Sequence, residues 1–95
     1  MTVKATSRSS YYQHVMEGKA KSQRERILEC LEASTNPLTR LQISYITGIR
    51  LTSVCGRVNA LIENKQVSIA YDGVDPATDR PAEYLRAGVV QRRLL

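Results

Sequence analysis

The sequence predicts a mainly α-helical α+β domain, with three to four helices followed by a small two-stranded β-hairpin. Apolar residues between positions 51 and 62 recur about every 3.6 residues, which indicates an amphipathic helix. After Lys65 the apolar spacing changes to two residues, and a stretch rich in Gly, Pro and Asp follows. That change is typical of two strands joined by a turn. A chain of 95 residues has room for one domain with a small core.

The first third of the chain predicts an arm and two helices. Residues 1–9 are polar, basic and rich in Ser and Thr, so we expect a flexible arm there. A short helix is expected over residues 11–17, ended by Gly18. A second helix is expected over residues 22–34, because Pro37 and its neighbours interrupt the helical pattern.

The next helix is expected to begin after Thr39. Gln42, three positions later, is placed to complete a capping box with Thr39. Ile43 and Ile46 are expected to face the core from this helix. Leu38, just before the cap, can form a short bridge to the edge of the sheet.

The helix over residues 51–64 is the centre of the predicted fold. Gly48 suits the left-handed position of the turn before it, and Ile49 is expected to fill the angle between the two helices. The inward stripe of the helix consists of Leu51, Val54, Val58, Leu61 and Ile62. The opposite face is small and polar, with Ser53, Gly56 and Ala60. Such a face can approach a partner closely, as a helix in the major groove of DNA must.

The β-hairpin is predicted from residue 67 onward. Residues 67–71 alternate between apolar and polar and indicate a half-buried strand. Residues 72–81 read as a long turn, and residues 82–86 as the returning strand, anchored by Tyr84. Together the patterns divide the chain into the arm, a domain over residues 10–87 and a tail over residues 88–95.

The charge of the chain favours an acidic partner. The formal net charge is +5 and the isoelectric point is about 9.6. Nucleic acid is the most common acidic partner of proteins with such an excess of positive charge. Residues 1–26 contain six Lys or Arg and only two Glu. We therefore expect the N-terminal part to supply much of the attraction to phosphate.

No combination of residues points to catalysis, a metal or a cofactor. Cys30 and Cys55 lie far apart, without metal or disulfide spacing, and are expected to be reduced packing residues, which fits a cytoplasmic protein. His14 is the only histidine and has no ligand partners nearby in the sequence. Ser53 has no neighbouring base, so nucleophilic catalysis has no support. We expect a binding protein rather than an enzyme.

Three segments together resemble the winged helix-turn-helix family of DNA-binding domains. They are LTRLQISYITGI, LTSVCGRVNALIENKQV and DPATDRPAEYLR, and the resemblance covers residues 22–87. The chain looks similar to small helix-turn-helix proteins of bacteriophages and prophages, and more distantly to the MarR type of regulator. The resemblance implies a sequence-specific protein that binds double-stranded DNA and regulates phage or bacterial transcription.

In that family the helix after the Gly turn enters the major groove, and the hairpin, called the wing, lies along the backbone or minor groove. By position, the resemblance implies a groove-facing set made of Arg50, Thr52, Ser53, Gly56 and Arg57. Arg80 would be at the wing tip. Thr39 and Arg40 would meet phosphate at the start of the preceding helix, where free N–H groups point outward.

Two features differ from the family pattern and support an alternative. The wing carries Asp72, Asp75 and Asp79 against Arg80, so it contacts DNA through Arg80 alone or not at all. An apolar surface patch of Leu41 and Tyr45 is expected on the third helix. The alternative is a protein-interaction module, a phage factor that binds a host transcription, replication or defence protein.

The chain is also expected to form a homodimer, because one recognition helix contacts few bases and two-fold pairing increases specificity. The candidate dimer segments are the helix with Tyr11 and Tyr12 and an apolar tail. The apolar residues of the tail are Val89, Val90, Leu94 and Leu95. Docking of these segments on their own domain is the alternative.

Overall fold

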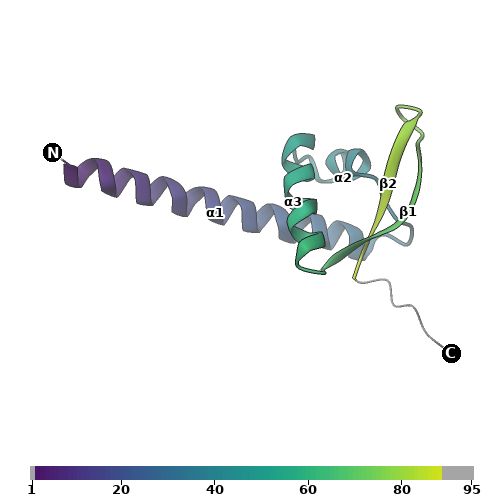
Figure 1. The fold of residues 1–95 in the computed structure, drawn as a ribbon, viewed down its shortest axis with the longest axis horizontal. Helices are drawn as coiled ribbons and strands as arrows, with labels where there is room; N and C mark the ends of the chain where they lie inside the picture. Colours follow the sequence, from purple (N-terminus) through teal and green to yellow (C-terminus); the bar gives the residue numbers. More distant parts are fainter. Residues whose placement is uncertain (1, 89–95) are drawn as a thin grey trace.

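The structure is a computed structural model that describes the backbone of residues 2–88 and the side chains of residues 14–88. In this part of the chain, three helices are followed by a two-stranded antiparallel sheet (Figure 1). The elements are α1 (Thr2–Ala33), α2 (Arg40–Thr47), α3 (Leu51–Glu63), β1 (Val67–Asp75) and β2 (Arg80–Ala87). The predicted α+β class, with helices first and a hairpin last, is therefore confirmed.

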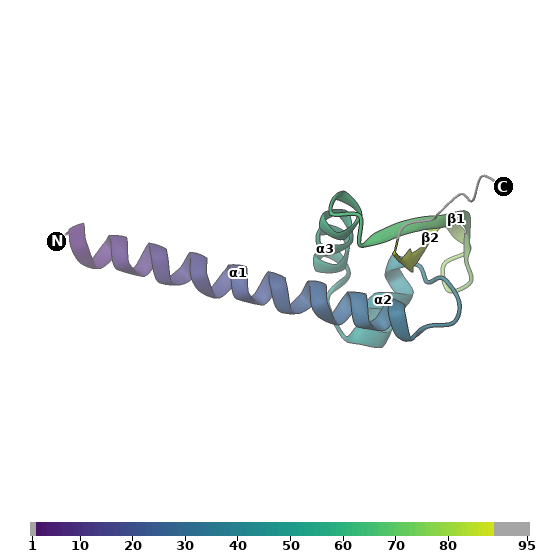
Figure 2. The same ribbon diagram turned by 90° about the horizontal axis from the view of Figure 1, so that it is seen from below.

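The core lies where the second half of α1 meets α2, α3 and the hairpin. Figure 2 shows α3 and the hairpin on the same side of α1, while the first half of α1 continues past α3 and away from the other elements. The fully or almost fully buried apolar side chains come from every element. They are Ile27, Leu31, Ile43, Ile49, Val54, Val58, Leu61, Val67 and Leu85. Among the described residues, no helix is long and apolar enough to cross a membrane.

Helix α1 corrects the expected organisation of the N-terminal third. It runs without interruption from Thr2 to Ala33, where the sequence predicted an arm, a break at Gly18 and two separate helices. A single Gly inside a helix costs only about 1 kcal/mol relative to Ala. Because no Pro occurs in this stretch and Gly18 is flanked by Glu17 and Lys19, which favour helix, the helix can pass through it.

The start and end of α2 follow the predicted local signals. The hydroxyl oxygen of Thr39 accepts a hydrogen bond from the Gln42 amide (3.1 Å), and the Gln42 side chain accepts one from the Thr39 amide (2.9 Å). This reciprocal pair confirms the capping box. Gly48 ends the helix in the left-handed region, with φ of 74°, and Ile49 is buried behind it. The predicted turn between α2 and α3 is therefore confirmed.

Two side chains predicted for the core are exposed instead. Ile46 is 63% exposed, because the buried side of α2 follows steps of four residues from Thr39 through Ile43 to the half-buried Thr47. Leu51 is 40% exposed, because it occupies the first position of α3 and lines an open groove between the helices and the hairpin. Val54, Val58 and the remaining stripe of α3 confirm the predicted inward face.

The hairpin is longer and its turn shorter than predicted. Strand pairing continues to Asp75 opposite Arg80, so the turn is confined to residues 76–79. The expected alternation over residues 67–71 is wrong beyond Val67, because Ile69 is 40% exposed and Tyr71 is 51% exposed. A bulge between these two residues also shifts the register of the strand pairing. Leu38 forms the predicted bridge, to Leu85, through two backbone hydrogen bonds of 2.8 and 3.0 Å.

Gly73 lies inside β1 and faces a pair of stacked tyrosines. The rings of Tyr71 and Tyr84 stack with centroids 4.8 Å apart, and the Tyr84 hydroxyl donates a hydrogen bond to the Val74 carbonyl (2.7 Å). A β-carbon at Gly73 would lie 2.9 Å from a carbon of the Tyr84 ring. The Tyr84 ring is held by its stack with Tyr71 and by its hydroxyl hydrogen bond, so it has little freedom to move away.

We therefore expect Gly73→Ala to lower the free energy of unfolding by about 1–3 kcal/mol, as measured by urea denaturation. Gly56→Ala is the matched control, because no described atom outside its chain neighbours and the backbone of its own helix lies within 4 Å of a β-carbon placed there. That substitution is expected to raise stability by up to about 1 kcal/mol through helix propensity. Equal effects of the two substitutions would contradict this account.

Candidate nucleic-acid interface

The outward face of α3 is small, polar and open. Thr52, Gly56, Asn59 and Glu63 are exposed and follow one another along the helix at spacings of three or four residues. The space above Gly56 is clear among the described residues, which excludes close packing of another described element as the reason for a glycine there. This face can therefore come within van der Waals distance of a large partner.

Arg57 lies on the flank of α3 that faces α1. Its side chain is half-buried, and its Nε donates a hydrogen bond to Oε1 of Gln23 in α1 (3.2 Å). Among the described residues, its two terminal nitrogens carry no hydrogen bond. Gln23 therefore restricts the guanidinium group and leaves its terminal nitrogens available at the edge of the open face.

Arg50 and Ser53 are placed at the start of α3. Arg50 is exposed at the N-cap position, without a side-chain capping bond, and Ser53 is half-buried. Together with Thr52 and Gly56, they place most of the expected groove-facing set around the first half of one helix.

Thr39 is too deeply buried to make the contact with phosphate that the sequence predicted. Thr39 is only 1% exposed, and its hydroxyl donates a hydrogen bond to Oδ2 of Asp75 in the hairpin (2.7 Å). The hydroxyl proton is therefore donated inside the protein, and the Thr39 amide donates to Gln42, so neither donor is left for a phosphate. Arg40 is also engaged, because it forms an ion pair of 2.8 Å with Glu83 on β2.

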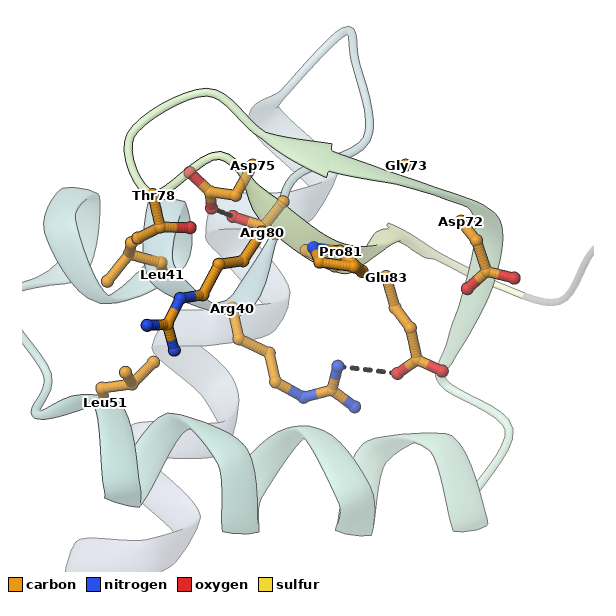
Figure 3. Close-up of a pocket in the computed structure, with 12 residues that line it drawn as sticks. Arg40, Leu41, Leu51, Asp72, Gly73, Asp75, Thr78, Arg80, Pro81 and Glu83 are labelled. Atoms are coloured by element: carbon orange, nitrogen blue, oxygen red, sulfur yellow. Dashed lines mark hydrogen bonds and ion pairs between the residues drawn. The ribbon is translucent and has the colours of Figure 1, made fainter.

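A groove of about 640 Å³ separates the hairpin from the starts of α2 and α3 (Figure 3). Leu41 and Leu51 form its helical wall, and Arg80 extends from the hairpin toward Leu51. Asp72 and Glu83 also line it. The groove therefore combines an apolar wall with charges of both signs, and its single strongly exposed cation among the described lining residues is Arg80.

The sequence suggested that Asp75 is a surface charge of the hairpin, but the structure buries it. It is 3% exposed, and its second carboxylate oxygen accepts a hydrogen bond from the Ala77 amide (2.8 Å). The hydroxyl of Thr39, followed by the Ala77 amide, lowers the pKa of Asp75 because both stabilise the ionised form. The local bond to Ala77 follows a common Asp turn pattern and could have been expected from Asp75-Pro76-Ala77.

The lowered pKa of Asp75 predicts an acid-dependent loss of stability. Because the folded pKa lies below the unfolded one, the contribution is fully present above the ordinary aspartate pKa near 4 and is lost as the pH falls through the lowered value. We expect Asp75→Asn to be less stable than the native chain at neutral pH. The difference should shrink below about pH 4 in denaturation curves recorded at several pH values. A difference that is independent of pH would contradict the assigned ionisation.

The remaining polar and sulfur groups form no reactive cluster in the part of the chain that the structure describes. No group of three or more His, Cys, Asp or Glu side chains is placed there to hold a metal ion. Cys30 and Cys55 are half-buried free thiols, and burial raises the pKa of Cys30. His14 is exposed.

Comparisons of this chain with models of protein families, with curated proteins and with solved structures find no match. Its function is therefore inferred from the residues of the open α3 face, the flanking arginines and the groove beneath the hairpin.

Proposed function

We propose that this chain is a winged helix-turn-helix protein that binds double-stranded DNA in a sequence-specific manner and regulates phage or bacterial transcription. The observation that carries the proposal is the open, small outer face of α3, with Arg50 and Arg57 at its edges. The order of α2, a glycine turn, α3 and a hairpin supports it. In this proposal α3 enters the major groove and the β1–β2 hairpin is the wing.

The dimensions of α3 suit the major groove. A helix of 13 residues is about 20 Å long, and the groove of B-DNA, about 12 Å wide, admits one α-helix. Gly56 lets the backbone approach the base edges, while Thr52 and Asn59 offer hydrogen-bonding groups. Arg57, held by Gln23, is the residue best placed to pair with a guanine at the edge of the face.

Phosphate attraction would come from both sides of α3. Arg80 extends from the hairpin on one side (Figure 3). On the other side, the first half of α1 projects past α3, and residues 2–16 contain Lys and Arg but no Asp or Glu (Figure 1). Neutralising phosphates with such cations makes binding fall with salt, so the proposal includes a strong salt dependence.

Selection of bound duplexes from a random pool tests the proposal. We expect a short enriched motif, and tighter binding to it than to random duplex at each of several salt concentrations. Recovery of no duplex, or of duplexes without a shared motif, would refute sequence-specific binding. The full chain should be used, because the basic half of α1 belongs to the proposed surface.

A second function, binding to another protein, is favoured by one observation. Tyr45 is 88% exposed and its neighbour Ile46 is 63% exposed, which places two large apolar side chains together on the surface of α2. Leu41, which the sequence had placed in this patch with Tyr45, is half-buried instead. A double substitution, Tyr45→Ser with Ile46→Ser, separates the two functions. It should leave duplex binding unchanged if α3 is the interface. Loss of a stoichiometric host partner from a nuclease-treated lysate, without loss of DNA binding, would support the second function.

We also propose that the protein acts as a homodimer. Val15 and Met16 of α1 are 48% and 43% exposed on the projecting part of the helix, and could contribute apolar contact. The side chains of Tyr11 and Tyr12 and the tail residues 89–95 lie outside the described residues. Light scattering should report a dimer at tens of micromolar or below, since half-site recognition pairs two protomers. A monomer at that concentration would contradict the proposal.

A further inference from the structure

The hairpin is joined to the start of α2 by three separate contacts. Two backbone hydrogen bonds pair Leu38 with Leu85, and Arg40 forms its ion pair with Glu83. The third contact is the 2.7 Å hydrogen bond between the buried side chains of Thr39 and Asp75. Three consecutive residues before and in α2 are thus bonded to the hairpin.

The Thr39–Asp75 contact differs from the other two in its place along the hairpin. Leu85 and Glu83 lie in the body of β2, whereas Asp75 is the last residue of β1, beside the turn. Asp75 pairs with Arg80 across the strands, and its carbonyl accepts a hydrogen bond from the Asp79 amide (2.7 Å). A contact that limits the motion of Asp75 therefore also limits the motion of the turn and of the Arg80 backbone.

Burial and charge make this contact a strong one. Thr39 and Asp75 are 1% and 3% exposed, so water competes little for their hydrogen bond. A hydrogen bond to an ionised carboxylate is about twice as strong as a neutral one. Thr39 is itself held by the capping box, which fixes the direction of its hydroxyl.

We propose that Thr39 and Asp75 form a latch that holds the hairpin tip against α2 and thereby positions Arg80 beside the start of α3. This inference rests on the proposed function, in that Arg80 is taken to meet the DNA backbone. Thr39 and Asp75 are positioning residues in this scheme. They act on the duplex only through Arg80.

Three substitutions separate the latch from the helix cap. Thr39→Val removes the hydroxyl and so both of its bonds, whereas Thr39→Ser keeps a hydroxyl and should preserve them. Gln42→Ala removes one bond of the capping box and leaves the bond to Asp75 in place. Asp75→Asn weakens the latch from the hairpin side with the capping box intact, and serves if Thr39→Val does not fold.

The first measurement is amide hydrogen exchange by NMR in the full chain. Thr39→Val, or Asp75→Asn in its place, should accelerate exchange of the Asp79 amide about tenfold or more. The exchange rates of the Leu38 and Leu85 amides should change less. In Thr39→Ser and Gln42→Ala, the Asp79 amide should exchange at the rate of the native chain. Unchanged exchange at Asp79 in the latch variants would overturn the latch.

The second measurement is a double-mutant cycle with the duplex selected by the native chain. Arg80→Ala should weaken binding about tenfold in the native background and less than about twofold in the latch variant, since Arg80 is no longer positioned there. Equal losses in both backgrounds, or no loss in the native chain, would overturn the positioning role. If the native chain binds no duplex, the proposed function fails, and hydrogen exchange alone then decides whether the latch exists.

Discussion

Replacing Leu85 by alanine is expected to lower the free energy of unfolding by about 2–5 kcal/mol. Leu85 has no exposed surface and lies in the core where the hairpin meets the helices. Its truncation removes apolar burial and leaves a cavity that a small domain cannot readily refill. Since whole domains are stable by only about 5–15 kcal/mol, urea denaturation should show a large shift of the midpoint.

Leu51→Ala is the matched control for this prediction. The sequence predicted that Leu51 is buried and that Tyr84 anchors the returning strand, but Leu51 is 40% exposed and the fully buried residue of that strand is Leu85. Its truncation is expected to cost about 1 kcal/mol or less. A cost for Leu51→Ala equal to that for Leu85→Ala would mean that the start of α3 is packed more tightly than the structure shows.

Replacing Arg57 by alanine is expected to weaken binding to the selected duplex by about 1–3 kcal/mol, or roughly 5- to 150-fold in Kd. The reason is geometric. Gln23 restricts the guanidinium, so little side-chain freedom remains to be lost when its terminal nitrogens pair with a base. Fluorescence anisotropy with the selected duplex and with a random duplex measures the effect on each.

The pattern of loss distinguishes base contact from phosphate contact. If Arg57 reads a base, the loss should be large for the selected duplex and small for random duplex, whereas a phosphate contact weakens both and reduces the salt slope by about one. Arg86→Ala is the control, because Arg86 is exposed on β2 near Pro37, on a separate surface from α3. Binding unaffected by Arg57→Ala would exclude Arg57 from the interface. Equal losses for Arg57→Ala and Arg86→Ala would indicate a general charge effect.

Gln23→Ala extends the same argument to a residue that the sequence did not indicate. It should reduce affinity by less than Arg57→Ala and have no further effect when Arg57 is already alanine, because Gln23 acts through that side chain. The pair spans 34 positions of sequence, so no local pattern could have connected them.

Most of the fold could be predicted because its signals are local. The capping box of Thr39 and Gln42 and the left-handed Gly48 depend on a few neighbouring residues. The stripe of Val54 and Val58 depends only on the period of a helix. Two local predictions failed. Gly18 was expected to end a helix, although a glycine inside a helix costs only about 1 kcal/mol. The alternation expected over residues 67–71 fails at Ile69, which is exposed although it precedes the bulge.

The sequence by itself determined the order of elements and the cap and turn around α2, because helix periodicity and turn chemistry act over a few residues. It centred the outer face of α3 on Ser53, Gly56 and Ala60, but Ser53 and Ala60 are half-buried and the exposed face instead runs through Thr52, Gly56, Asn59 and Glu63. Only the tertiary structure decided that Thr39 is buried and bonded to Asp75, 36 positions away. The two meet because the buried contacts around Leu85 seat the hairpin on α2. The sequence signal of a capping threonine is the same whether its hydroxyl faces solvent, phosphate or a carboxylate. In this protein, the packing of the hairpin against α2 places the hydroxyl against a carboxylate.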